Sequence, residues 1–221
     1  MAEFLRKKID ALKWWTHPKH EENPTDVAVI PVGFKETEDW SFVPLNGKQA
    51  MIGTTDVLEE RHLGLGDEVF ITGLFKSHAG VERNSPIIRI GNVSLMKELI
   101  QTTHYGLTEA YLIEARSVGG LSGSPVFIHM PPIQQINGEI TPGSGPLFYL
   151  LGLMHGHFDI PRLNEDVVRE APENTDQINT GIGIVIPVEK ILETIRDNVE
   201  LADARKKLAG LMHGSATPSP T

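Results

Sequence analysis

The chain has 221 residues, 40% of them hydrophobic, and a formal net charge of −9 at pH 7. This negative charge argues against general affinity for nucleic acid or anionic membrane surfaces, because both attract cationic proteins. Cysteine is absent, which excludes disulfides, a thiol nucleophile and thiolate metal ligands, and favours a cytoplasmic location unless a signal lies upstream of Met1. No run reaches transmembrane length, and residues 1–10 lack the apolar core of a signal peptide.

Short apolar runs separated by turn residues occupy the N-terminal part of the chain, residues 1–62. The run Asp26–Ile30 is β-branched after an initial acid, which predicts a short strand. Trp40–Leu45 and Gln49–Thr54 are joined by Asn-Gly, which predicts a hairpin. His17 and His20 fall in a predicted loop without a third ligand nearby, so we expect them to be solvated rather than bound to a metal.

The middle of the chain, residues 63–187, alternates apolar runs with turns rich in glycine and proline. Its predicted strands are Asp67–Phe75, Pro86–Leu95, Glu109–Ala115, Val126–Ile128, Leu147–His155 and Gly181–Ile186. Gly91 is expected to mark a bend or bulge, Leu95–Gln101 to add a helical turn, and Phe158–Thr180 to form a long polar loop. Beyond Pro187, apolar residues recur at helical spacing, which predicts a helix over residues 188–214 and a disordered tail over 215–221.

This order of elements predicts an all-β protein with about nine strands and one C-terminal α-helix. A parallel α/β fold would need helices between successive strands, and the pattern contains no such helices. The 21 glycines and 15 prolines suit a fold of many short strands, since each connection needs turn residues.

The segment Gly119–Phe127 combines a glycine-rich turn with a serine and an immediately following apolar strand. Glycines in this turn permit positive φ and close backbone approach, so Ser122 can lie beside outward-pointing N–H groups, as acyl transfer requires. A plain glycine-rich loop before a buried strand is the structural alternative. An α/β-hydrolase elbow is excluded, because that turn needs Gly-x-Ser-x-Gly before a helix, whereas position 124 is Ser and a strand follows.

Five stretches, in this order, resemble the bacterial trypsin-like serine proteases of the chymotrypsin fold. They are the Asp26–Ile30 strand, Gly66–Gly73, the serine turn Gly120–Phe127, Leu151–Gly156 and Gly181–Pro187 with its following helix. The resemblance covers residues 13–200. It implies a trypsin-like double β-barrel, with an incomplete first barrel in residues 1–62, a second barrel in 63–187 and a C-terminal helix in 188–214.

The resemblance also implies roles for individual residues. Ser122 would be the nucleophile, the N–H groups of Gly120 and Ser122 would form the oxyanion hole, and Asp26 would hold the catalytic imidazole. Substrate backbone would run beside Met154, His155, Gly156 and His157. The expected reaction is hydrolysis of a peptide or protein substrate through an acyl-enzyme, without a cofactor, a metal or nucleic acid.

Three departures separate this sequence from the family pattern. Ser124 stands where the better-known members have a second glycine, and Leu121 replaces a residue that is often polar. The family's histidine lies several strands before its aspartate, but only His17 and His20 precede Asp26, both within the connection into its strand. The sequence therefore indicates either a truncated frame whose full form carries the histidine, or a degenerate domain; the retained aspartate and oxyanion turn favour truncation.

Two other functions stay open at this point. One is a non-catalytic pseudoprotease module that binds peptide beside Leu151–His157. The other is a carbohydrate- or metal-binding β domain that uses His155 and His157, although a metal site would need a carboxylate or third histidine in register. The sequence makes no prediction of oligomeric state.

Overall fold

The computed structural model describes residues 13–22, 24–31, 51–74, 86–102, 106–115, 121–143, 147–161 and 177–214. These residues form a mostly β protein with helices at its C-terminal end, which confirms the predicted class. The chain divides into two compact units. The first comprises Met1–Pro44, His104–Gly106 and Glu189–Thr221, and the second comprises Leu45–Thr103 and Leu107–Val188.

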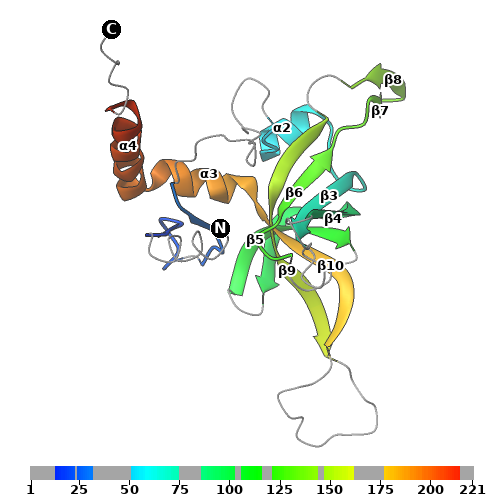
Figure 1. Cartoon of the computed structure of the whole chain (residues 1–221). Helices are drawn as coiled ribbons and strands as arrows, with labels where there is room; N and C mark the ends of the chain where they lie inside the picture. The colour runs from blue at the N-terminus through cyan, green and yellow to red at the C-terminus, as the bar shows by residue number, and fades with distance from the viewer. Residues whose placement is uncertain are drawn as a thin grey trace, which may run out of the picture. The chain divides into compact units, whose positions relative to one another are not determined.

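The second unit is built on a closed six-stranded barrel (Figure 1). Its strands, in spatial order, are β10 (Gln177–Pro187), β5 (Gly106–Ala115), β4 (Pro86–Thr102), β3 (Glu68–Leu74), β6 (Pro125–His129) and β9 (Phe148–Pro161). The pairs β3–β4, β3–β6, β6–β9, β9–β10 and β10–β5 are antiparallel. Each strand therefore has a neighbouring strand on both sides, and β6 pairs with β9 as far as Leu153.

Alternation along each strand places apolar side chains inside the barrel. In β3, Val69 and Ile71 are fully buried, and in β6, Val126 and Ile128 are fully buried. The residues between them point outward and keep partial exposure. This period of two is the pattern that predicts half-buried strands from sequence, because successive side chains of a strand point to opposite faces. Burial of these apolar side chains is the main stabilising contribution to the barrel.

Strand β4 is longer than its sequence pattern predicts. The expected helical turn at Leu95–Gln101 is wrong, because the strand continues in extended conformation to Thr102. Ile100 is buried against Ala110 of β5 and Ile184 of β10. Packing against β5 and β10 therefore outweighs the local helical preference of this segment.

Residues 51–54 and the short helix that follows them belong to the second unit and lie beside β9. The Gly53 amide donates to the Leu150 carbonyl at 2.9 Å, and the Leu150 amide donates to the Met51 carbonyl at 2.6 Å. Helix α2 (Thr55–Glu60) follows and places the fully buried Leu58 in the barrel core. Of the predicted hairpin at residues 40–54, only residues 51–54 are described, and the rest lies outside the described residues.

A two-stranded hairpin extends from the second unit beyond the barrel (Figure 1). It consists of β7 (Ile133–Ile136) and β8 (Glu139–Pro142), joined by Asn137 and Gly138. Both turn residues have positive φ, 52° and 87°, as the tight turns of twisted hairpins require. The Gln134 side-chain amide donates to the Arg61 carbonyl at 2.9 Å, which ties the hairpin to the turn after α2.

The first unit contains two short strands and two helices among its described residues. Strand β1 (Trp15–Thr16) pairs antiparallel with β2 (Ala28–Val29). The single helix expected over residues 188–214 is two helices, α3 (Val188–Asp197) and α4 (Val199–Gly214). Asn198 separates them, and its side-chain oxygen accepts the Leu201 amide at 3.0 Å, which caps the second helix. These strands alone do not define a first barrel.

His17 is buried, so the expectation that it is solvated is wrong. Its side chain is 7% exposed, and its Nε2 lies 2.8 Å from Glu193 Oε2 of α3. The Lys19 amide donates to His17 Nδ1 at 3.2 Å, so Nε2 carries the proton given to Glu193. Lys190 Nζ lies 3.3 Å from the same carboxylate oxygen. The N-terminal segment is thus held to α3 through a shared carboxylate.

This carboxylate predicts a pH-dependent contribution to stability. Partial burial raises the pKa of Glu193, but the hydrogen bond from His17 and the charge of Lys190 outweigh it and hold the pKa below its usual 4.5. Stability from this acid is therefore present above pH 4.5 and is lost as pH falls through the lowered value. We expect Glu193→Gln to lower unfolding free energy at pH 7 by about 1 kcal/mol or less, since the carboxylate is partly solvated.

Thermal unfolding of both proteins at pH 7 and pH 3 measures this effect. The difference between wild type and Glu193→Gln should be smaller at pH 3 than at pH 7, because the wild-type acid takes up a proton as pH falls through its lowered pKa. Glu200→Gln is the matched control, because the exposed Glu200 forms its ion pair with the exposed Lys13 and should change the melting temperature less. A Glu193→Gln difference that is equal at both pH values contradicts the assignment.

Candidate active site

A tight turn before β6 presents Ser122 on the outside of the barrel. The Ser124 amide donates to the Leu121 carbonyl at 2.9 Å, which closes the turn. Gly123 has φ of +80°, a conformation that a side chain disfavours. Leu121 is 4% exposed and belongs to the barrel core, whereas Ser122 is exposed. Among the described residues, Ser122 has no hydrogen-bond partner.

Two short hydrogen bonds fasten this turn to β9. The Gly123 amide donates to the Met154 carbonyl at 2.7 Å, and the Met154 amide donates to the Ser124 carbonyl at 2.8 Å. The structure therefore brings the serine turn directly beside Met154–His157, the segment that the sequence assigns to substrate binding. Both groups of residues belong to the second unit.

Gly73 of β3 provides the space in which the turn rests. A Cβ at Gly73 would overlap the Ser124 hydroxyl and would lie 2.9 Å from Leu121 Cδ2. The Ser124 and Leu121 side chains thus pack directly over the backbone of β3. Only glycine at position 73 leaves room for this arrangement, which no local sequence pattern indicates.

Gly73→Ala should therefore displace the serine turn and lower unfolding free energy by about 1–3 kcal/mol, as overpacking does. The double change Gly73→Ala with Ser124→Ala should recover part of this loss, because it removes the overlapping hydroxyl. Urea unfolding of the two variants and of Ser124→Ala alone measures the coupling. Additive effects of the two substitutions would contradict the described packing.

A β-bulge interrupts β9 at His155. Met154 pairs with Val185 of β10 and Gly156 pairs with Ile184, so His155 is the extra residue of the bulge. The Met154 side chain is 2% exposed and points into the core. The His155 and His157 side chains are partly exposed. Bulges of this kind redirect side chains and are frequent next to active sites.

The structure does not place the remaining predicted site residues relative to Ser122. Gly120, the second oxyanion donor expected from the resemblance, lies outside the described residues. Asp26 is exposed and precedes β2 in the first unit, whereas Ser122 belongs to the second, so no distance between them is defined. Their common role in a catalytic triad stays a prediction.

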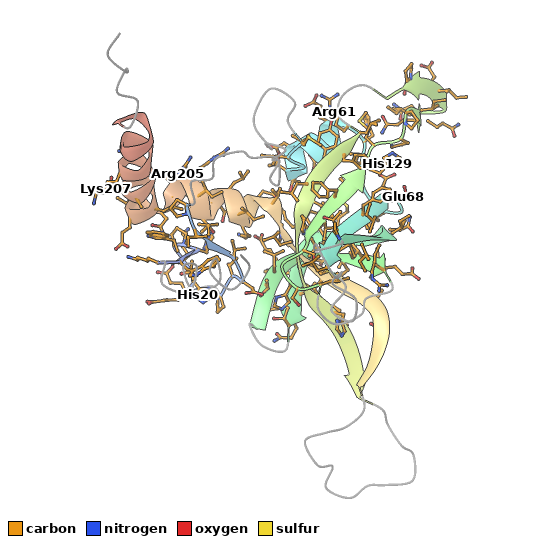
Figure 2. All side chains as sticks on the ribbon, viewed as in Figure 1. His20, Arg61, Glu68, His129, Arg205 and Lys207 are labelled. Carbon is orange, nitrogen blue, oxygen red and sulfur yellow. The ribbon has the colours of Figure 1, made fainter. Side chains whose placement is uncertain are left out.

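A second polar cluster, which the sequence interpretation missed, lies on the outer face of the barrel. His129 Nδ1 lies 3.3 Å from Glu68 Oε2 (Figure 2). The imidazole also contacts Phe70 and Phe148, with ring centroids 5.8 Å and 5.3 Å away. Burial raises the pKa of neighbouring Asp67, and the hydrogen bond from the Gly64 amide and the proximity of His129 oppose this rise only in part. These residues pack strands β3, β6 and β9 together.

The described residues contain neither a metal-ligand cluster nor a helix suited to a membrane. In that part of the chain, no three histidine, aspartate or glutamate side chains are grouped so that they could hold a metal ion. No described helix has the length and apolar character needed to span a membrane. The exposed Ser122, on a turn fastened to β9, is the candidate for chemistry among the described residues.

Comparisons with known proteins return no family model, no curated protein and no solved structure that matches the chain. Its function is therefore inferred from the serine turn, where an exposed hydroxyl lies beside backbone groups held in place by hydrogen bonds.

Proposed function

We propose that the chain is a serine peptidase module that hydrolyses peptide bonds through an acyl-enzyme on Ser122. The observation that carries the proposal is the exposed hydroxyl on a glycine turn that two backbone hydrogen bonds fasten to β9. A nucleophile needs this combination of access and fixed position, because a misplaced reacting atom forfeits most of the rate gain from orientation.

The barrel topology supports the same proposal. A closed six-stranded antiparallel barrel, with the serine turn leading into β6, is the architecture expected of the second barrel of a trypsin-like protease. Asp26, to which the resemblance assigns the role of holding the catalytic imidazole, belongs to the first unit, and its role stays a prediction.

The proposed reaction begins with attack of the Ser122 hydroxyl oxygen on the substrate carbonyl carbon. The N–H groups of Gly120 and Ser122 would stabilise the resulting oxyanion, with about 3 kcal/mol for each donor. Backbone groups of His155–His157 would hold the substrate as an added strand. Water then hydrolyses the acyl-enzyme and regenerates the serine.

Covalent labelling tests this proposal. A fluorophosphonate should modify wild-type protein, and peptide mass spectrometry should locate the adduct on Ser122. Ser122→Ala should lose the adduct completely, whereas Ser124→Ala, which removes the other hydroxyl of the same turn, should retain it. An adduct that persists in Ser122→Ala contradicts the nucleophile assignment.

A non-catalytic peptide-binding module is the second candidate. It is favoured by one observation, the absence of any hydrogen bond between Ser122 and a described residue, which leaves the hydroxyl unactivated in this state. This function predicts that peptides bind beside Met154–His157 equally well in wild type and in Ser122→Ala, without turnover. Isothermal calorimetry with a peptide library, followed by product analysis, separates the two candidates.

A further inference from the structure

We propose that His155 is the general base that activates Ser122, so that nucleophile and base come from the same barrel. This inference rests on the proposed function, because it assigns a residue to the reaction at Ser122. It differs from the arrangement implied by the resemblance, in which the histidine comes from the preceding barrel.

The hydrogen bond between the turn and β9 sets the distance between the two residues. The amide that follows Ser122 donates to the carbonyl that precedes His155, at 2.7 Å. With standard peptide dimensions of about 2.4 Å and about 2.8 Å on either side of this bond, the two Cα atoms are at most about 8 Å apart. A serine hydroxyl reaches roughly 2.4 Å from its Cα and an imidazole nitrogen roughly 4.5 Å, so a hydrogen bond of about 2.8 Å can join them.

The pattern of burial shows that the Ser122 and His155 side chains both lie outside the barrel core. Leu121 and Met154 both lie in the same core cluster, with exposures of 4% and 2%. The next residue along the chain in each case, Ser122 and His155, is outside that cluster and reaches solvent. The hydrogen bond from Gly123 to Met154 therefore links two backbone segments, and the side chain next to each end of it, that of Ser122 or His155, reaches solvent.

The bulge distinguishes His155 from His157 on the same strand. His157 pairs in register with Gly183 of β10 and lies two residues farther from the hydrogen bond to the turn. Two residues of strand add roughly 6–7 Å, which takes the His157 imidazole beyond the reach of the Ser122 hydroxyl. His155, as the extra residue of the bulge, is the one whose direction departs from the regular alternation.

The proton and electron movements balance without any added reagent. The Ser122 hydroxyl gives its proton to the unprotonated imidazole nitrogen of His155 as its oxygen bonds to the substrate carbonyl carbon. The carbonyl π electrons move onto the oxygen, and the protonated imidazole then donates its proton to the departing amine as the C–N bond breaks. Serine–base hydrogen bonds are often long in free enzymes and shorten when substrate binds, which agrees with the unpartnered hydroxyl in this structure.

The rate of fluorophosphonate labelling at Ser122 tests the assignment, because this reaction needs the same proton transfer and releases fluoride. We expect His155→Gly to slow labelling by about 100-fold or more, the usual contribution of a general base. Added imidazole should restore the rate in proportion to its concentration, since it can occupy the vacated space. His62→Asn, which removes an exposed histidine from a turn after α2 and keeps a residue suited to its positive φ, should label at the wild-type rate.

The outcomes distinguish a failure of the His155 assignment from a failure of the proposed peptidase function. If wild type labels at Ser122 and His155→Gly labels equally fast, the base assignment is wrong while the proposed function stands. A slow His155→Gly that keeps the wild-type melting temperature and gains nothing from imidazole also overturns the assignment. If wild type fails to label at all, the proposed function itself fails.

Discussion

Replacing Gly152 with alanine should lower the unfolding free energy of the barrel by more than about 3 kcal/mol, through steric overlap with fixed backbone. A Cβ at this position would overlap the carbonyl oxygen of Ile186 and would lie 2.9 Å from its carbonyl carbon. Gly152 pairs with Val126 of β6 on one side and with Pro187 of β10 on the other. Because β9 is held on both sides, it cannot move away from the added methyl group.

Urea unfolding followed by circular dichroism measures this loss. Gly156→Ala is the matched control in the same strand, because a Cβ at Gly156 meets no atom within 4 Å and its φ lies outside the left-handed region. The control should change stability by less than about 1 kcal/mol. Equal stability of Gly152→Ala and wild type would show that β9 and β10 do not approach as closely as described.

Leu121→Ala should have the second largest effect, because it removes the buried anchor of the serine turn. Leu121 is 4% exposed within the barrel core, so its truncation should lower unfolding free energy by about 2–5 kcal/mol. The turn should also loosen, since the hydrogen bond from Gly123 to Met154 depends on the same backbone position. We therefore expect faster exchange of the Gly123 amide and slower labelling of Ser122.

Hydrogen exchange by mass spectrometry, together with urea unfolding, checks both parts of this prediction. Leu65→Ala provides the control, because Leu65 is 66% exposed and its truncation should cost little. If Leu121→Ala destabilises the barrel but leaves exchange at Gly123 unchanged, the turn is held by its backbone contacts alone. That result would contradict the role of Leu121 as an anchor.

Strands in which buried and exposed residues alternate along the sequence could be predicted from it. The run expected over Asp67–Phe75 forms β3, Glu68–Leu74, because alternate residues pack inside the barrel. The extension of β4 to Thr102 could not be predicted, because it depends on packing against β5 and β10. Gly91 also illustrates this limit. At Gly91 a bend or bulge is expected from the sequence; the residue is in regular register with Val69, so the pair with β3 has no bulge there, and a side chain would collide with the Glu114 carbonyl of β5.

At the candidate site too, features set by adjacent residues could be predicted, whereas features set by contacts between distant residues could not. The glycine turn and the access to Ser122 follow from residues adjacent in sequence, and the structure places this serine on the surface. The bulge at His155 depends on register with β10, which short motifs do not encode. Burial of His17 likewise depends on Glu193, which is 176 residues away in the chain. Such partners are identified only once the chain has folded.

Trapping an acyl-enzyme is the most direct test of the central claim that the Ser122 hydroxyl acts as a nucleophile. Wild-type protein mixed with p-nitrophenyl acetate and quenched in acid during the initial burst should carry one acetyl group. Peptide mass spectrometry should place that group on Ser122. Release of p-nitrophenol without acetylated protein, or an acetyl group on Ser124 or a lysine instead, would contradict the account.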